Sequence, residues 1–321
     1  MTPASRCLSA LAGLLLASAA TSEELAPHSL LDRMNEAVRL LDYEGRFVVQ
    51  ADNRLDAMYI VHRVEAGAER ERIVSLTGRP REIIRSDKAV ACLVPGRAPQ
   101  INVERRARGR SFSPLRGVSA DQLDNFYLMK LLEPSRVAGR EAHQILIEPR
   151  DDLRYGYRLF VDQASSLPLR SVMFDETQRP VSQMMFVELE VGPDVTPIER
   201  DIAAMPAPVG DSQVTIPGER LAPPAWSLDD LPPGFQLNVH RRRAMADAQG
   251  DMEHFIFSDG LASVSVYIQP HVDEKWLSGE SSIGAAGAVG RIVGDHQVVV
   301  VGEVPPKTLH WFARQVRAAA P

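Results

Sequence analysis

Few residues in this chain combine the types and spacing that catalysis needs. Ser258 and Asp259 stand together at the start of the stretch SDGLASVSVYIQP (258–270) and offer a hydroxyl and a carboxylate. A serine nucleophile also needs a base, but the stretch has no histidine and no G-x-S-x-G turn. Ser258-Asp259-Gly260 instead has the composition of a tight turn, because glycine accepts positive φ and aspartate bonds its own backbone.

Other catalytic and metal-binding motifs are also missing from the sequence. It contains no H-E-x-x-H, Walker or dinucleotide-binding motif. No two of its eight histidines are spaced about two to four residues apart, as metal ligands often are. Asp151 and Asp152 are adjacent carboxylates whose side chains diverge, which is typical of a turn. We therefore predict a binding protein with no catalytic residues, no metal and no cofactor.

The N-terminus has the pattern of a secretory signal peptide. Arg6 precedes an apolar run at 8–16, and small residues follow as far as Ala20. The run is shorter than the roughly 20 residues that span a bilayer. We expect a signal peptide at 1–20, cleaved after Ala19 or Ala20, and an exported mature protein. The net charge of −6 gives no electrostatic case for nucleic-acid binding.

The elements that would position any site are mostly strands. Leu30, Leu31, Met34, Val38 and Leu41 fall at helical spacing, with Ser29 as a candidate N-cap. A second helix is predicted over 119–132. Alternating polarity predicts strands at 46–50, 57–64, 71–76, 81–86, 89–94, 142–148, 155–162, 169–175 and 181–189. Because the connections are short, we expect an α+β fold whose large antiparallel, unclosed β-barrel is covered or plugged by helices.

A proline-rich segment separates this large domain from a smaller one. Seven prolines fall within 192–225, where they stiffen the chain and cannot continue a sheet interior. We predict a large domain at 21–191, a linker at 192–225 that few contacts cross, and a small α+β domain at 226–321. The small domain has predicted strands near 235–242, 252–257, 261–269, 288–293 and 297–302, and a closing helix over 306–318.

Apolar residues share one face on several strands of the large domain, which leaves two interpretations. They fill the space between sheet and helices, or they line a cavity for an apolar ligand, with the 119–132 helix as plug or lid. The candidate lipid-binding residues are Phe47, Val49, Tyr59, Val61, Phe126, Met129, Leu159 and Met185. The arginine clusters are solvated loops or sites for anionic groups; they comprise Arg105, Arg106, Arg108 and Arg110, and Arg241, Arg242 and Arg243.

Several stretches resemble the RseB/MucB family, periplasmic negative regulators of the envelope-stress sigma factor (sigma-E/AlgU type). In the large domain they are YEGRFVV (43–49), ERIVSLTGRPREIIR (71–85), VACLVPG (90–96) and YGYRLFVDQASSLPLRSVMFD (155–175). In the small domain they are LPPGF (231–235), SDGLASVSVYIQP (258–270) and VVVVGEVPPKTLHWFARQV (298–316). Their order and spacing make the resemblance specific, although QASSLPLRS (163–171) lacks the glycine expected in that turn.

The resemblance implies a lipoprotein-carrier-like large domain, an unclosed barrel with helices inside, joined to a small C-terminal domain. It also implies binding to the periplasmic part of a single-span anti-sigma factor, which shields that factor from proteolysis. The resemblance further implies that lipopolysaccharide or mislocalised lipoprotein displaces the protein from the anti-sigma factor. A periplasmic lipoprotein or lipid carrier is the alternative, but a carrier does not need the linker and second domain. A periplasmic hydrolase is a third interpretation, although no nucleophile has its partners.

The expected partner surface is the strand that follows the SDG turn, together with the stretch VVVVGEVP. Ser263, Ser265 and Tyr267 share one polar face of that strand, and an exposed strand can add a partner segment edge to edge. The other interpretation is that these strands only build the small sheet. The candidate partner-binding residues are Ser258, Asp259, Gly260, Ser263, Ser265, Tyr267, Val301 and Gly302. Homo-oligomerisation is left open.

Overall fold

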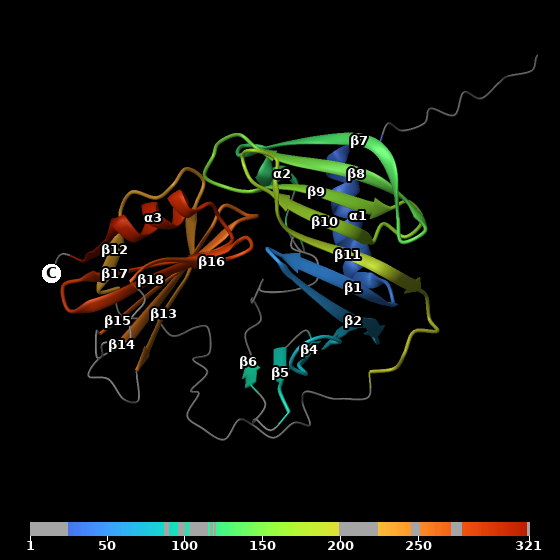
Figure 1. Cartoon of the computed structure of the whole chain (residues 1–321), viewed down its shortest axis with the longest axis horizontal. Coiled ribbons are helices and arrows are strands. Elements are labelled where there is room, and N and C mark those ends of the chain that lie inside the picture. The colour runs from blue at the N-terminus through green and yellow to red at the C-terminus, as the bar shows by residue number, and fades with distance from the viewer. Residues whose placement is uncertain are drawn as a thin grey trace, which may run out of the picture.

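The computed structural model describes residues 25–86, 90–95, 100–102, 115, 118, 120–198, 224–244, 251–270 and 278–319. The expected signal peptide, the arginine cluster at 105–110 and most of the expected linker lie outside the described residues. Two large sheets of unequal size, each with a helix against it, and one two-stranded sheet make up the described structure (Figure 1). In the described part of the chain, no helix combines the length and apolar character needed to cross a membrane.

An 11-stranded antiparallel sheet forms the large domain, in the order β6-β5-β4-β3-β2-β1-β11-β10-β9-β8-β7. Because β6 and β7 lie at its two ends and do not pair, the sheet is unclosed, which confirms the predicted architecture. Its strands are β1 (Tyr43–Ala51), β2 (Arg54–Glu65), β3 (Ala68–Ser75), β4 (Glu82–Ser86), β5 (Val90–Leu93), β6 (Gln100–Asn102), β7 (Tyr127–Val137), β8 (Arg140–Pro149), β9 (Gly156–Asp162), β10 (Pro168–Phe174) and β11 (Pro180–Val191).

The helix α1 (Pro27–Leu40) packs its apolar stripe against this sheet. Leu30, Leu31 and Met34 are almost fully buried in a cluster with Leu159 of β9. The helix begins at Pro27, whose fixed φ suits a first helical position. Ser29 therefore lies inside the first turn rather than at the N-cap, which corrects the predicted start.

The predicted second helix is wrong beyond Leu123. The structure has a four-residue helix, α2 (Ala120–Leu123), and then the edge strand β7. At the start of β7, Tyr127 and Met129 are buried while Leu128 and Lys130 are exposed, so the burial alternates with a period of two. Apolar residues on both faces of NFYLMKLL hide this alternation in the sequence, and pairing with β8 selects the strand.

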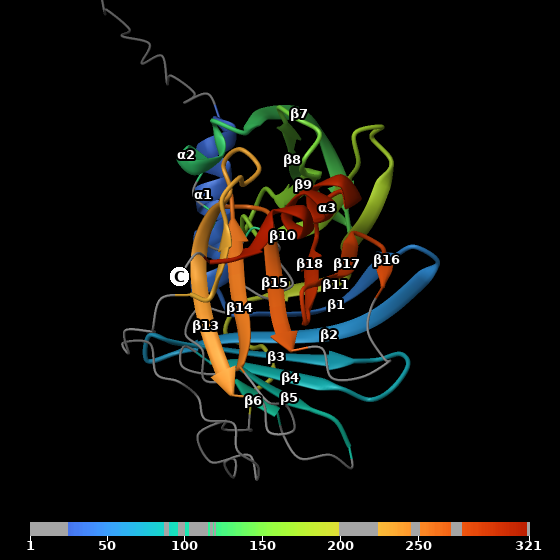
Figure 2. The same ribbon diagram turned by 90° about the vertical axis from the view of Figure 1, so that its left-hand side faces the viewer.

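A six-stranded antiparallel sheet forms the small domain, in the order β13-β14-β15-β18-β17-β16 (Figure 2). Its strands are β13 (Gln236–Ala244), β14 (Asp251–Ser258), β15 (Ser263–Pro270), β16 (Gly279–Ile283), β17 (Ala286–Val293) and β18 (His296–Gly302). The helix α3 (Pro306–Gln315) buries Phe312 against Val264 and Val300 on one face of the sheet. α3 ends before the predicted residue 318, because β19 (Val316–Ala318) pairs with β12 (Trp226–Leu228).

The segment that follows β11 stays on the large domain. Val195 and Ile198 are buried against Val61 of β2, and the Arg63 Nη1 donates to the carbonyl oxygen of Val195 at 2.6 Å. The start of the expected linker at 192–225 therefore covers part of the large sheet.

Candidate functional site

The strand β15 lies in the middle of the small sheet rather than at an edge. β14 pairs with it on one side and β18 on the other, so that Ser265 stands between Ile256 and Val301. The backbone groups along both sides of the strand are used within the sheet. The prediction that a partner segment adds to this strand edge to edge is therefore wrong.

One face of β15 remains available, and we call it the outer face of the small sheet. Val264, Val266 and Ile268 are buried on the α3 side, so Ser263, Ser265 and Tyr267 point to the opposite side. The outer face consists of Ser263, Ser265 and Tyr267, with His254 and Ile256 of β14 and Val301 of β18 opposite them.

Exposure on the outer face is moderate. Ser263 is exposed, Ser265 and Tyr267 are half-buried, and Val301 is 36% exposed. Gly302 has the other parity: it pairs with Val264, and a Cβ there would lie 2.8 Å from the carbonyl oxygen of Ser263. Of the predicted partner-binding residues, the structure thus brings Ser263, Ser265, Tyr267 and Val301 together.

A histidine stack borders the outer face. The ring of His254 stacks on that of Tyr267, with centroids 4.1 Å apart. Burial, together with the nearby charge of Arg241, lowers the pKa of His254 to about 4. The ring is therefore neutral at pH 7 and gains no charge until the medium is distinctly acidic.

We expect the stability of the chain to fall below pH 6.5 because of His254. Its folded pKa of about 4 lies below the ordinary histidine pKa of 6.5, so the unfolded chain binds the proton first and folding free energy is lost as pH falls. At pH 5 the loss should be about 1 kcal/mol, roughly half of what the full shift would give, because the ring is partly exposed. Urea unfolding at pH 7 and pH 5 measures it, and His254→Phe, which keeps the stack, should show a smaller difference. An equal difference in both proteins would contradict the assignment.

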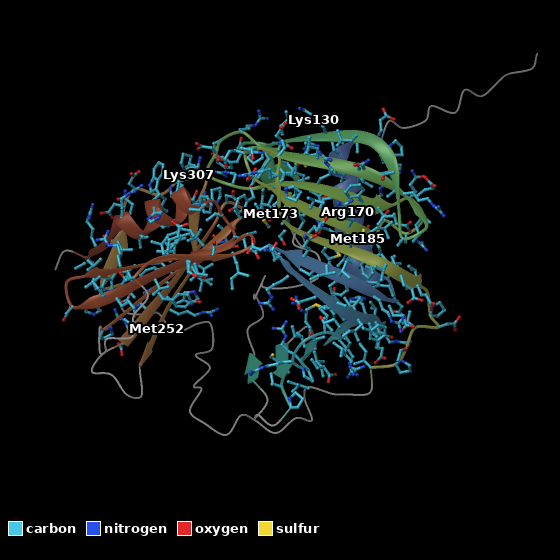
Figure 3. All side chains as sticks on the ribbon, in the orientation of Figure 1. Lys130, Arg170, Met173, Met185, Met252 and Lys307 are labelled. Atoms are coloured by element: carbon cyan, nitrogen blue, oxygen red, sulfur yellow. The ribbon has the colours of Figure 1, made fainter. Side chains whose placement is uncertain are left out.

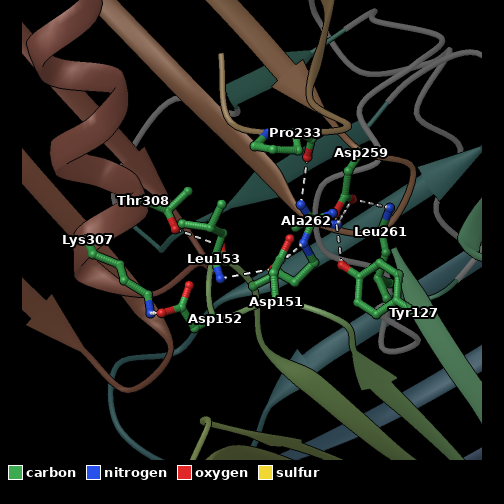
Figure 4. A network of polar contacts seen from close by, with 11 residues as sticks. Tyr127, Asp151, Asp152, Leu153, Pro233, Asp259, Leu261, Ala262, Lys307 and Thr308 are labelled. Carbon is green, nitrogen blue, oxygen red and sulfur yellow. Dashed lines mark hydrogen bonds and ion pairs between the residues drawn. The ribbon is translucent and has the colours of Figure 1, made fainter. Parts of the chain in front are cut away.

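Asp259 lies in the junction between the two domains (Figure 4), and both it and Ser258 are buried rather than on an exposed turn. The Asp259 Oδ1 accepts hydrogen bonds from the backbone N–H groups of Leu261 at 2.8 Å and Ala262 at 2.7 Å, as expected of a turn aspartate. Its Oδ2 accepts from the Arg154 Nη1 at 2.6 Å and from the Tyr127 hydroxyl at 2.9 Å. Both side chains of the Arg154–Asp259 pair are fully buried.

The other two nitrogens of Arg154 also donate hydrogen bonds. Its Nε donates to the Asp151 Oδ1 at 3.0 Å, and its Nη2 donates to the carbonyl oxygen of Pro233 at 2.7 Å. Its guanidinium carbon lies 4.9 Å from the ring centre of Phe126 and 5.4 Å from that of Phe235. Arg154 of the large domain is thus enclosed by groups from both domains.

Among the described residues, three further polar contacts cross the junction. The Thr308 Oγ1 donates to the carbonyl oxygen of Leu153 at 2.6 Å, and Lys307 forms an ion pair with Asp152, which lowers the pKa of that carboxyl. At the other end, the backbone N–H of Gly284 donates to the Asp52 Oδ2 at 2.6 Å. The loop at 151–154 is a turn, as predicted, and it also docks the small domain. No sequence pattern marked Arg154, since an arginine beside two aspartates is common in solvated turns.

The predicted lipid-binding residues do not share one surface. Phe47, Met129 and Leu159 are buried in the clusters that include α1. Tyr59 and Val61 cluster instead with Val195 and Ile198.

 Val49 is half-buried beside Phe47, and Phe126 lies in the domain junction rather than on a lid. The eight candidates are therefore spread over different parts of the large domain, and a shared lipid cavity stays a prediction.

Met185 lies on the opposite sheet face from its neighbour Met184. It pairs with Val48 of β1 and Arg170 of β10, whereas the neighbouring Met184 pairs with Val49 and is buried. Since successive residues of a strand point to opposite faces, Met185 and Val49 lie on different sides of the sheet.

The arginine cluster at 241–243 is partly paired with carboxylates of the small domain. The Arg242 Nη2 donates to the Glu253 Oε1 at 2.7 Å, and the His240 Nε2 lies 2.8 Å from the Glu253 Oε2. Burial acts to raise the pKa of Glu253, but the hydrogen bonds from Arg242, Ala225 and His240 outweigh it and lower the pKa. Arg242 is thus held within the small domain. Among the described residues, no group of three His, Cys, Asp or Glu side chains is placed to hold a metal ion.

Comparison with known proteins covers both domains. Two family models match the chain: the MucB/RseB N-terminal domain over residues 26–207 and the MucB/RseB C-terminal domain over residues 220–317. The sigma factor AlgU regulatory protein MucB of Pseudomonas aeruginosa is 32% identical over 295 residues, which are 90% of each chain. The sigma-E factor regulatory protein RseB of Haemophilus influenzae is 27% identical over 306 residues, which are 95% of each chain.

Solved structures give the same result. The structure of the Pseudomonas aeruginosa MucA/MucB complex matches with a TM-score of 0.70 and 30% identity, over 92% of this chain and 99% of that one. The crystal structure of MucB in complex with MucA(peri) matches with a TM-score of 0.67 and 29% identity, over 92% of this chain and 100% of that one.

Proposed function

The chain belongs to the MucB/RseB family, and on this premise we propose that it binds the periplasmic segment of a membrane anti-sigma factor. By covering that segment it shields the anti-sigma factor from proteolysis and so restrains an envelope-stress sigma factor. The observation that carries the proposal is the likeness, over 92% of this chain, to MucB in its complex with MucA. The function requires export to the periplasm, for which the N-terminal signal pattern is the support.

We place part of the partner surface on the outer face of the small sheet. Its residues come from neighbouring strands, and the half-buried Ser265 stands between the side chains of Ile256 and Val301. A small side chain between two apolar ones leaves room for a partner side chain to pack. Because the backbone of β15 is already paired, the partner binds by side-chain packing against the face, not by adding a strand.

Two substitutions test this surface. Val301→Asp places a charge in the proposed contact, and Ser265→Trp fills the space between its neighbours. Each should weaken binding of a labelled periplasmic peptide from the anti-sigma factor at least about tenfold, which corresponds to about 1.4 kcal/mol. Fluorescence anisotropy measures the affinity. Leu55→Asp is the matched control, since Leu55 is 63% exposed but lies on the large sheet. Unchanged affinity in both variants would place the partner elsewhere.

We propose further that lipopolysaccharide or the acyl chains of mislocalised lipoprotein displace the partner. Burying acyl chains contributes about 0.8 kcal/mol per CH₂, so a few chains rival a protein interface. The same anisotropy titration, repeated with lipopolysaccharide, should show competition. Simultaneous binding of lipid and peptide would reject displacement while leaving the peptide-binding proposal intact.

A further inference from the structure

Two arginines lie side by side on one face of the large sheet, opposite to the face of Leu159. Arg158 of β9 is opposite Val172 of β10, and Arg170 of β10 is opposite Phe160 of β9. Directly paired residues, and residues two apart on a strand, share a face. These four therefore lie on one face, whereas Leu159 points to the other face and packs in the α1 cluster.

Each of the two arginines has a sequestered donor. The guanidinium carbon of Arg170 lies 5.1 Å from the ring centre of Phe160, and its Nη2 donates to the Gln183 Oε1 at 2.9 Å. The Nε groups of Arg158 and Arg170 are shielded from solvent, and neither has an acceptor among the described residues. Buried donors in proteins are normally satisfied, so a matched pair of such groups calls for a specific explanation.

Other sequestered arginines in the chain have acidic partners. Arg63 lies 3.8 Å from a carboxylate oxygen of Asp42, and Arg85 lies 3.4 Å from one of Glu71. Within the part of the chain that the structure describes, Arg158 and Arg170 form no ion pair with any carboxylate. The contrast favours an anionic partner outside the chain, because both side chains are half-buried and the charge-bearing Nε groups are shielded from water.

The charged groups around the arginine pair determine how much negative charge a bound ligand must carry. Lys130 shares this face, because it and Arg158 both pair with Leu146, but Lys130 has its own partner in Glu148 at 3.3 Å. Figure 3 labels Lys130, Arg170 and Met185 on this domain. Two positive charges remain uncompensated by described residues, at diagonal positions whose separation of about 7–8 Å is within reach of long side chains.

From these observations we propose that Arg158 and Arg170 bind a phosphate monoester. A phosphate monoester carries about −1.5 to −2 charges at pH 7, with a second pKa of about 6, so one group balances both arginines. A carboxylate would balance only one. Guanidinium groups also pair with phosphate oxygens bidentately. The site is distinct from the proposed partner surface, which lies on the small domain. Either proposal can therefore be wrong while the other holds.

NMR of the arginine Nε–H groups tests the site directly in the unmodified chain. Titration with glycerol phosphate at constant ionic strength should shift the signals of Arg158 and Arg170, and the affinity should fall as pH drops from 7.5 to 5.5. The double variant Arg158→Gln/Arg170→Gln should bind at least about tenfold more weakly. The control Arg39→Gln/Arg46→Gln removes the same charge from arginines that pair with Glu69 and Glu188, and it should bind normally.

A vesicle assay identifies the source of the phosphate. Phosphatidylcholine vesicles containing phosphatidic acid present the monoester on a lipid, and glycerol phosphate presents it free. Tighter binding to the vesicles, lost in the double variant, assigns the site to a lipid headgroup; equal binding assigns it to a soluble monoester. If glycerol phosphate and sodium chloride shift the two signals alike, or if both double variants bind equally, the proposal is wrong. Preferential binding of an acidic peptide over both phosphates would also overturn it.

Discussion

Replacing Arg154 with alanine should lower the free energy of unfolding by about 3–5 kcal/mol, because it leaves a buried carboxylate without its counter-charge. Asp259 would keep the hydroxyl of Tyr127 and two backbone N–H groups as donors. It would lose the guanidinium that neutralises it, and the carbonyl oxygen of Pro233 would lose its donor. Chemical denaturation followed by circular dichroism measures the change.

Two further variants separate the buried pair from a general effect of lost charge. Lys307→Ala removes the Lys307–Asp152 pair, which also crosses the junction but is largely exposed, and it should cost less than about 1 kcal/mol. The double variant Arg154→Ala/Asp259→Ala removes both buried charges and should recover part of the loss, since contacting residues are coupled. A loss below about 1 kcal/mol in Arg154→Ala alone would mean that the pair does not hold the domains together.

The two domains contact each other more closely than the sequence predicts. The proline-rich segment predicts few contacts between them, because such segments separate independent units. In the structure, Leu261 and Ala285 of the small domain belong to the same buried cluster as Leu159 of the large domain. Interdomain contact is therefore part of the core, and the buried Arg154–Asp259 pair opposes separation of the two domains.

Strands with clear alternation were predictable from the sequence, and so was the unclosed sheet that they form. The wrong predictions concern segments whose apolar pattern fits both a helix and a strand, and strands whose position in the sheet is decided by pairing with strands distant in sequence. In the residues 127–132, apolar side chains fit both a helix and a strand, and only the partner β8 settles the choice. The position of β15 in its sheet was also out of reach, because strand order depends on contacts distant in sequence.

The candidate site shows the same limit. Parity along β15 correctly placed Ser263, Ser265 and Tyr267 on one face, since alternation is a local property. It could not show that the carboxylate of Asp259 meets an arginine 105 residues away. Nor could composition separate Arg158 and Arg170 from the other arginines, because the absence of a nearby carboxylate is a property of the fold.

Replacing Gly45 with alanine should destabilise the large domain by about 3 kcal/mol, at the upper end of the usual range for overpacking. Gly45 lies in β1, where it pairs with Leu189 of β11, and this strand pair joins the two halves of the large sheet. A Cβ at this position would lie 2.3 Å from the carbonyl oxygen of Glu188 and 2.9 Å from the ring of Phe186. The first contact is with backbone, which cannot move without shifting the strand pair.

Gly287→Ala is the matched control for this prediction. Its Cβ would lie 2.6 Å from the Leu309 Cδ1, a similar overlap, but that atom is the end of a flexible side chain that can rotate away. Neither glycine needs a left-handed backbone, so the comparison isolates the contact. We expect a loss of about 1 kcal/mol or less for Gly287→Ala, measured by urea unfolding of both variants. Equal losses would show that the β1–β11 pair yields as easily as a side chain, and that this joint does not hold the half-barrel rigid.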